Sequence, residues 1–393
     1  MMDILKIAKS YENFTAQNLS DIVKIKSLSG EEKEVIEKIE SILKKENFDE
    51  VWTDGFGNLI GRIGKGDKII AVDAHIDVVD TGDLSLWDFE PFSGEIKNGY
   101  VYGRGSADQK GGAASMITAG KILKDLGFDE ATILFVFSIM EEDCDGLCWN
   151  YIIEKDGIKP DLVILTEPTD GKINIGQRGR MEIEIEFKGI SAHASAPERG
   201  INAVRNASET VLKIDKLNKK LKKNKFLGKG SVAVTEFISS SPSLCAIPDY
   251  ARIHLDRRLT LGEDKRSVIK ELKDIIPKGA KIIILEYNKR SYKGEIFGQE
   301  KYFPTWMIDE DSKIVKIAKN TYRSLFKRNP VIGKWTFSTN GVSICGRHKI
   351  PAIGFGPGEE RFAHSPNEKI PVKELVKASA FIANYILKLK EEL

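Results

Sequence analysis

The 393-residue sequence has few cysteines and no long apolar run. Four cysteines in a chain of this length form no disulfide framework, which favours a reducing compartment. The longest uncharged apolar stretch, Ala131 to Met140, is much shorter than the roughly 20 residues that span a bilayer. The segment from Met1 to Phe14 carries charged residues throughout, so it contains no signal-peptide core. We therefore expect a cytoplasmic protein without a membrane partner.

An excess of charge of one sign is also lacking. Lys and Arg number 60 against 58 Asp and Glu, a formal net charge of +2. Binding to nucleic acid or to an anionic membrane favours a strong basic excess, so we expect neither partner. Hydrophobic residues make up 41% and charged residues 30%, which is typical of globular proteins. A chain of 393 residues exceeds one ordinary core and predicts two domains.

The N-terminal third alternates strand and helix patterns, which indicates an α/β fold with a mixed sheet flanked by helices. Ser29 followed by Glu32 is typical of a capping box, here at the start of a helix that runs to about Lys45. The expected strands are Glu50–Thr53, Asn58–Ile63, Lys68–Ala74, Ala131–Ile139 and Asp161–Thr166, with a helix over Gly111–Leu126. Near the C-terminus we expect a helix over Asp311–Phe326, a loop around Gly341, a strand over Ala352–Phe355 and a helix from Val372.

The middle of the chain has a different pattern. Residues Met181 to Phe187 alternate strictly between apolar and charged, as in a half-exposed antiparallel strand. The expected elements that follow are a helix over Asn202–Lys220, strands over Ser231–Ile238 and Ala251–Leu259, a helix over Asp264–Ile276 and a strand over Lys281–Tyr287. This order is that of a split βαβ, or ferredoxin-like, sandwich. We therefore predict an inserted α+β domain at residues 180–292, which interrupts a catalytic domain of residues 1–179 and 293–393.

Several metal-ligand residue types follow predicted strands or lie in loops. His75 and Asp77 close an apolar strand and point to the same side, which suits a histidine ligand whose second N–H is held by a carboxylate. Asp108 lies in a glycine-rich turn, Gly103 to Gly112, where the backbone can approach closely. That turn matches neither the dinucleotide nor the P-loop pattern. The other candidates are Glu141, Glu142, Glu167 and His364.

Together these motifs resemble, in order and spacing and over essentially the whole chain, the dinuclear-zinc peptidases and deacylases related to acetylornithine deacetylase, succinyl-diaminopimelate desuccinylase, aminoacylase and glutamate carboxypeptidase. The shared motifs are His75-Ile76-Asp77, Gly103 to Gly111, Glu141-Glu142, His364, and Ala192 to Pro197 followed by Asn202-Ala203. The segments Ser338–Ile344 and Gly354–Gly358 are closest to a hydrolase subgroup associated with selenium metabolism, whose motifs imply no substrate. Gln109 departs from the residues that many relatives carry after the aspartate, with little effect expected on the metals.

The resemblance implies two Zn²⁺ ions per chain, with Co²⁺ or Mn²⁺ as alternatives. Asp108 would bridge both ions. The other ligands would be His75 and Glu167 at one ion, and Glu142 and His364 at the other. Glu141 would be the general base that deprotonates the water between the metals, with Asp77 orienting His75.

The resemblance also implies residues that contact the substrate. His193 would stabilise the oxyanion, in many relatives across a homodimer formed by the inserted domain, and its alternative is an exposed residue without that role. Arg258 would hold a substrate carboxylate, or else form only an ion pair with Asp256. Asn340 and Gly341 lie where relatives carry substrate-binding residues.

The predicted function is cleavage of the amide bond of a small N-acyl amino acid or short peptide, as in a deacylase, dipeptidase or carboxypeptidase. One alternative is hydrolysis of cyclic amides or N-carbamoyl amino acids. A non-catalytic binding protein on the same fold would lack a ligand or the base, and none is missing. Cys144 and Cys148, one helical turn apart, would pair, bind metal or remain ordinary thiols, and the last is favoured because no second cysteine pair completes a zinc site.

Overall fold

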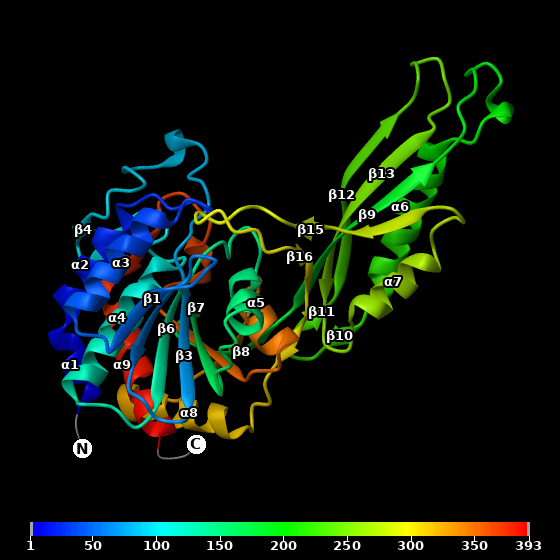
Figure 1. The fold of residues 1–393 in the computed structure, drawn as a ribbon. Helices are drawn as coiled ribbons and strands as arrows, with labels where there is room; N and C mark the ends of the chain where they lie inside the picture. The colour runs from blue at the N-terminus through cyan, green and yellow to red at the C-terminus, as the bar shows by residue number, and fades with distance from the viewer. Residues whose placement is uncertain (1–2, 391–393) are drawn as a thin grey trace.

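A nine-stranded mixed sheet forms the centre of the larger part of the molecule in the computed structural model, which describes residues 3–390 (Figure 1). Its strands are β1 (Glu50–Thr53), β2 (Leu59–Ile63), β3 (Ile69–His75), β6 (Thr132–Ser138), β7 (Leu162–Pro168), β8 (Ile173–Gln177), β18 (Trp306–Met307), β19 (Ile332–Trp335) and β20 (Ala352–Gly356). The order is β1-β2-β6-β3-β7-β20-β8-β18, with β19 beside β8. The parallel strands β6, β3, β7 and β20 are buried on both faces, which explains why their sequences are continuously apolar.

Helices cover both faces of this sheet. Alternate residues of β3 divide between the two cores, since Ile70 and Val72 pack on one side and Ala71 on the other. The first face carries α1 (Ile4–Ser10), α2 (Glu12–Val23), α3 (Lys33–Lys45), α4 (Lys110–Asp125), α8 (Lys313–Phe326) and α9 (Val372–Leu389). The second carries α5 (Leu147–Glu154) and the π-helical turn η3 (Val342–Arg347). The predicted α/β fold with a mixed sheet is confirmed, but α1 and α2 were not predicted and the expected loop around Gly341 leads directly into a helical turn.

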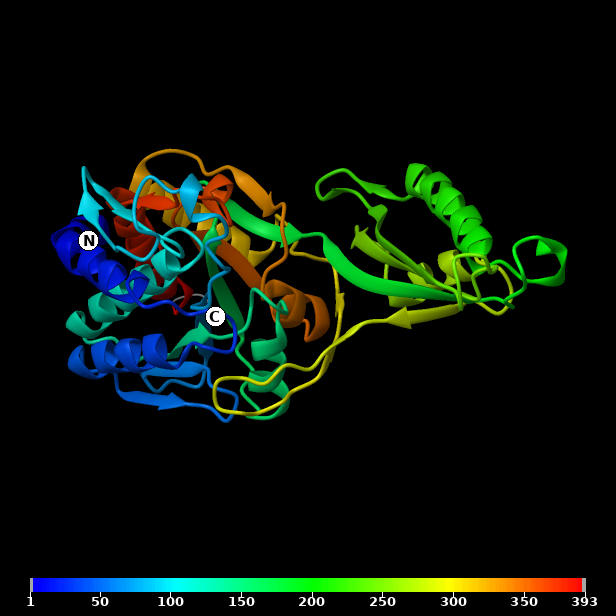
Figure 2. The same cartoon turned by 90° about the horizontal axis from the view of Figure 1, so that it is seen from above.

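A second sheet extends away from the first, as Figure 2 shows from above. It consists of β9 (Gly179–Lys188), β12 (Ser231–Ser240), β13 (Tyr250–Leu259), β14 (Lys281–Ile284) and the short β17 (Tyr302–Phe303). The antiparallel order β12-β13-β9-β14 places the first strand of this region between the third and the fourth, which is the predicted split βαβ arrangement. The alternating residues of β9 bury Met181, Ile183 and Ile185 in a separate core with α6 (Ala203–Lys220) and α7 (Lys265–Lys273).

Two connections join the sheets. One is direct, because β9 begins two residues after β8 ends. The other leaves β14 through the paired strands β15 (Glu286–Tyr287) and β16 (Gln299–Glu300), seen in yellow in Figure 2, returns to the second sheet at β17 and enters the first sheet at β18. Here Tyr287 and Lys289 both donate hydrogen bonds to Asp143, close to the loop that follows β6. The domain boundaries at residues 180 and 292 stay a prediction.

Among residues 3–390, none of the helices combines the length and the apolar character needed to cross a bilayer.

We expect the buried ion pair of the second sheet to be important for its stability. Arg257 is 1% exposed, donates to Glu263 at 2.7 Å and lies 3.3 Å from Glu271 on α7. Arg257→Ala would leave two carboxylates without their cation, so the free energy of unfolding in urea should fall by about 3–5 kcal/mol. Arg252→Ala on the same strand is the matched control, because its ion pairs are partly exposed, and should cost about 1 kcal/mol or less. Equal losses in the two variants would contradict this assignment.

Candidate metal centre

The candidate ligands meet because parallel strands end at one edge of the sheet. In the sheet, β3 lies between β6 and β7 and runs parallel to both. His75 is the last residue of β3, and Glu167 is the next-to-last residue of β7. Glu141 and Glu142 follow the end of β6. Ligands in open α/β sheets bind outside the carboxyl ends of such strands. Gly356 on β20 permits the close packing beside β7, since a Cβ there would lie 1.9 Å from the carbonyl oxygen of Thr166.

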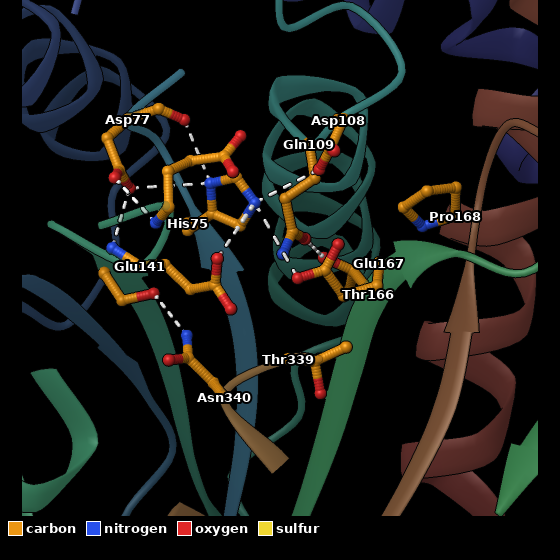
Figure 3. Close-up of polar contacts among 12 residues, drawn as sticks. His75, Asp77, Asp108, Gln109, Glu141, Thr166, Glu167, Pro168, Thr339 and Asn340 are labelled. Atoms are coloured by element: carbon orange, nitrogen blue, oxygen red, sulfur yellow. Dashed lines mark hydrogen bonds and ion pairs between the residues drawn. The ribbon is translucent and has the colours of Figure 1, made fainter. Parts of the chain in front are cut away.

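The five predicted ligands form two groups that share Asp108. His75 Nε2 lies 3.2 Å from Asp108 Oδ1 and 3.7 Å from Glu167 Oε1. His364 Nε2 lies 2.8 Å from Glu142 Oε2 and 3.6 Å from Asp108 Oδ2. Metal–ligand bonds of about 2.1 Å in a tetrahedral site place neighbouring ligand atoms about 3.4 Å apart, so these separations suit one small cation in each group. Figure 3 shows His75 pointing toward Asp108 and Glu167.

The chemistry of this cluster also suits a divalent cation. Burial raises the pKa of Glu167 well above its ordinary value, and the neighbouring His75 only partly offsets this. Burial and then the charge of Asp108 raise the pKa of Glu142 to about 7. The buried Oε2 of Glu167 has no hydrogen-bond partner within residues 3–390. Carboxylates so crowded and so dry are stabilised by a cation, and imidazole with carboxylate is a donor set of zinc and related ions.

Glu141 lies beside the ligands without joining either group. Its side chain is 5% exposed, and its Oε2 is 3.9 Å from His75 Nε2. Burial raises the pKa of Glu141 well above its usual value, with His75 acting in the opposite direction. Its other oxygen, Oε1, is buried and has no partner in the described part of the chain. A carboxylate in this position can exchange a proton with a molecule in the cleft, and neither candidate metal site loses a ligand when it does so.

Asp77 supports His75 and Glu141, as Figure 3 shows, and also Glu142. It accepts hydrogen bonds from the backbone N–H groups of Glu141 at 3.2 Å and Glu142 at 3.0 Å. His75 Nδ1 lies 3.0 Å from the backbone oxygen of Asp77 and 3.5 Å from its carboxylate, so the backbone is the nearer acceptor. The hydroxyl of Ser29 also donates to Asp77 at 2.6 Å. The predicted capping box is therefore wrong: α3 begins at Lys33, and the Ser29 hydroxyl is used at the site.

The loop of Asp108 is shaped by Glu368, a residue that was not among the predicted site residues. Glu368 is fully buried and accepts hydrogen bonds from the backbone N–H groups of Gly105, Ala107 and Asp108. It also pairs with Arg104 at 2.7 Å. The peptide bond between Asp108 and Gln109 is cis. Arg104 and Glu368 are 264 positions apart, so no local pattern in the sequence indicates this pairing.

A cleft of about 390 Å³ opens at the cluster. It is lined by the five candidate ligands, by Glu141 and by Asp145, Arg180, Arg258, Phe337, Ser338, Glu360 and Ala363. Arg258 is thus at the cleft as predicted, and it also makes two hydrogen bonds to Asp256, at 2.8 and 3.0 Å. This geometry is compatible with both predictions for Arg258, a contact to a substrate carboxylate and an ion pair with Asp256.

Asn340 and Gly341 lie outside the lining of the cleft. Asn340 is fully buried, donates to Asp73 at 3.0 Å and to Ser138 at 3.1 Å, and accepts from the N–H of Gly146 at 2.9 Å. A Cβ at Gly341 would lie 2.6 Å from the ring of Trp306. These two residues pack the core behind the site, and Ser338 of the same turn lines the cleft, so a role of Asn340 and Gly341 in substrate binding stays a prediction.

His193 is far from the cleft of its own chain. Arg180 lines the cleft near the start of β9, and Lys188 ends that strand about 26 Å further on, at about 3.3 Å per residue. His193 follows beyond Lys188, is exposed, and contacts Ser195 and the backbone of Ala246 between β12 and β13. The second sheet thus carries His193 on its distal end.

The remaining chemically interesting residues have structural surroundings. Cys144 and Cys148 are buried free thiols, as the favoured interpretation had it. Neither His254 nor His348 belongs to a metal-ligand group within residues 3–390.

Comparison with known proteins agrees with this geometry. Residues 71–388 match the family described as peptidase family M20/M25/M40. The uncharacterized protein YgeY of Escherichia coli strain K12 is 47% identical over 384 residues, which cover 97% of this chain and 95% of that protein. A probable succinyl-diaminopimelate desuccinylase of Staphylococcus epidermidis is 26% identical over 390 residues, covering 90% and 92% of the two chains.

A solved structure has the same fold. The YXEP protein of Bacillus subtilis, described as a dinuclear metal binding peptidase from the M20 family, superposes with a TM-score of 0.71 at 17% identity, covering 98% of this chain and all of that one. The family predicted from the motifs is confirmed, whereas the selenium-associated subgroup stays a prediction. With the family match spanning most of the chain and a relative at nearly half identity, the protein belongs to peptidase family M20/M25/M40 and is a metal-dependent hydrolase.

Proposed function

We propose that the protein hydrolyses the amide bond of a small N-acyl amino acid or short peptide at a centre of two zinc ions. The single observation that carries this proposal is the pair of ligand groups joined by Asp108, one oxygen of which faces each group. His75 and Glu167 would complete the first metal site, and Glu142 and His364 the second. When bound, two such ions supply Lewis-acid activation of water and of a scissile carbonyl.

Glu141 would move the proton in this reaction. Its carboxylate faces the cleft next to the ligands, which supports a role as general base toward the attacking water. The same carboxyl would then give the proton to the leaving amine. Asp77 accepts hydrogen bonds from the backbone N–H groups of Glu141 and Glu142, and would thereby hold both residues in place beside His75. Arg258 would bind a free carboxylate of the substrate at the wall of the cleft.

His193 would act in the cleft of a second copy, which requires a homodimer. Its position beyond the far end of β9 supports action between chains rather than within one. The strand β12 is an edge of its sheet and exposes Phe237 and Ile238, while α6 exposes Leu212. Unpaired strand edges with apolar side chains are natural sites of association between identical chains. We propose that this inserted region, residues 180–292, forms the dimer and that the protein is cytoplasmic.

A substrate panel with metal-replete protein tests the function. We expect hydrolysis of N-acyl amino acids or dipeptides, and activity should vanish after treatment with a chelator, because the ligands would then hold no Lewis acid. Zn²⁺, Co²⁺ and Mn²⁺ added back separately would identify the effective ion. Hydrolysis of hydantoins or N-carbamoyl amino acids in preference to the others would favour the alternative bond. Full activity in chelator would refute a metal-dependent reaction here.

Replacing the proposed base should separate catalysis from metal binding. Glu141→Gln is expected to lower turnover about 10²- to 10⁴-fold, because the amide cannot accept the proton of water. Elemental analysis should still find close to two metal ions per chain. The matched control is Glu142→Gln, which removes a proposed ligand from the adjacent position and should lower the metal content. Unchanged turnover in Glu141→Gln would show that another group is the base.

Mixed dimers test the proposed action of His193. Dimers of His193→Ala alone or Glu141→Ala alone should be nearly inactive. After subunit exchange, each mixed dimer would contain one cleft with both Glu141 and a partner histidine, so activity should reappear. Exchange is followed by mass or by affinity tags on the two variants. Exchange without recovered activity would place the action of His193 within one chain or remove it from the reaction.

A further inference from the structure

Two arginines stand side by side at the wall of the cleft. Arg180 on β9 and Arg258 on β13 are direct partners in the antiparallel register, so their side chains project from the same face of the sheet. Opposite residues of this kind have Cβ atoms about 5 Å apart. Both side chains line the cleft that holds the candidate metal ligands. Like charges placed directly opposite each other destabilise a sheet, which makes an anion between them favourable.

Arg180 has hydrogen-bonding capacity to spare. Its guanidinium makes one hydrogen bond, from Nη2 to Asp145 Oδ2 at 3.0 Å, while Nη1 lies 3.5 Å from Glu182 Oε1. Its Nε is buried without an acceptor in residues 3–390. Arg257 on the neighbouring strand also has a buried Nε without an acceptor in the described residues, but its other nitrogens donate five hydrogen bonds, to two backbone oxygens and to Glu263 and Glu271. Arg257 is thus a structural cation of the inserted sheet, whereas the guanidinium of Arg180 makes few such contacts.

The guanidinium of Arg180 is nevertheless held in place. It stacks over the ring of the buried Phe303, with 4.6 Å between Cζ and the ring centroid. Asp145, which also lines the cleft, holds it from the side of the catalytic sheet. The side chain of Arg180 is 21% exposed and that of Arg258 33%, so both are reachable from the cleft while losing little freedom on binding. Such pre-organised guanidinium groups are suited to carboxylate recognition.

Resting on the proposed function, we propose that Arg180 is a second specificity-determining residue, which binds the substrate carboxylate together with Arg258. The carboxylate would lie between the two guanidinium groups and take up the donors that Asp145 and Asp256 leave free. Asp145 then competes with the substrate for Arg180. The substrate class that this arrangement selects is an amide whose amine portion carries a free carboxylate.

The test compares two forms of one substrate from the panel, a free acid and its primary carboxamide. In Arg180→Gln, the preference for the acid, taken as the ratio of kcat/KM values, should fall about 10- to 100-fold through a higher KM for the acid. Arg180→Lys keeps the charge without the fork and should recover part of the preference. Asp145→Asn removes the competitor, so KM for the acid should fall or stay level while the preference is retained.

Arg252→Gln is the matched control, an ion-paired arginine on β13 outside the cleft lining, and should leave the preference unchanged. An Asp145→Asn variant that loses the preference as strongly as Arg180→Gln would overturn the proposal, since Arg180 would then act only as a brace. Full preference in Arg180→Gln would also overturn it. Failure of the wild-type protein to hydrolyse any amide would instead overturn the proposed function.

Discussion

The crowding of carboxylates around one buried histidine is the constraint on which the site depends. His75 Nε2 has Asp108, Glu141 and Glu167 within 3.9 Å, and burial raises the pKa of the two glutamates. Negative charges this close in a dry setting destabilise the fold unless cations balance them. In the proposed function, the two metal ions supply the positive charge that balances these carboxylates, and the same ions take part in the reaction. Stability and function therefore depend on the same cluster.

The strand β3 connects the metal-ligand cluster to the loop of the proposed base and to the core. Residues 73, 75 and 77 alternate along β3 and its extension, and each has a separate task. Asp73 accepts from Trp149, Ser138 and Asn340 in the core behind the sheet. Asp77 accepts hydrogen bonds from backbone N–H groups of the loop that carries the proposed base. A shift of β3 would thus move the histidine, the loop and the core network together, which explains why the site is built on a central strand.

The sequence predicted the sheet well and the supports of the site poorly, for a physical reason. Strands buried on both faces must be continuously apolar, so β3, β6 and β7 are visible locally. The partner of a buried polar side chain is set by tertiary packing, and no local pattern reveals it. No local pattern shows, for example, that Asn340 donates a hydrogen bond to Asp73, a residue 267 positions away. Ser29 is a second example: its local sequence favours a helix cap, but its hydroxyl donates to the carboxylate of Asp77, 48 positions away.

The length of β9 gives the two proposals a common geometry. Arg180 lies at the near end of the strand, in the cleft of its own chain, and His193 lies beyond the far end. In the proposed dimer, β9 and the loop that follows it would therefore carry a substrate contact in one active site and an oxyanion contact in the other. β9 is a central strand that pairs with β13 on one side and β14 on the other, so its near and far ends belong to one continuous sheet.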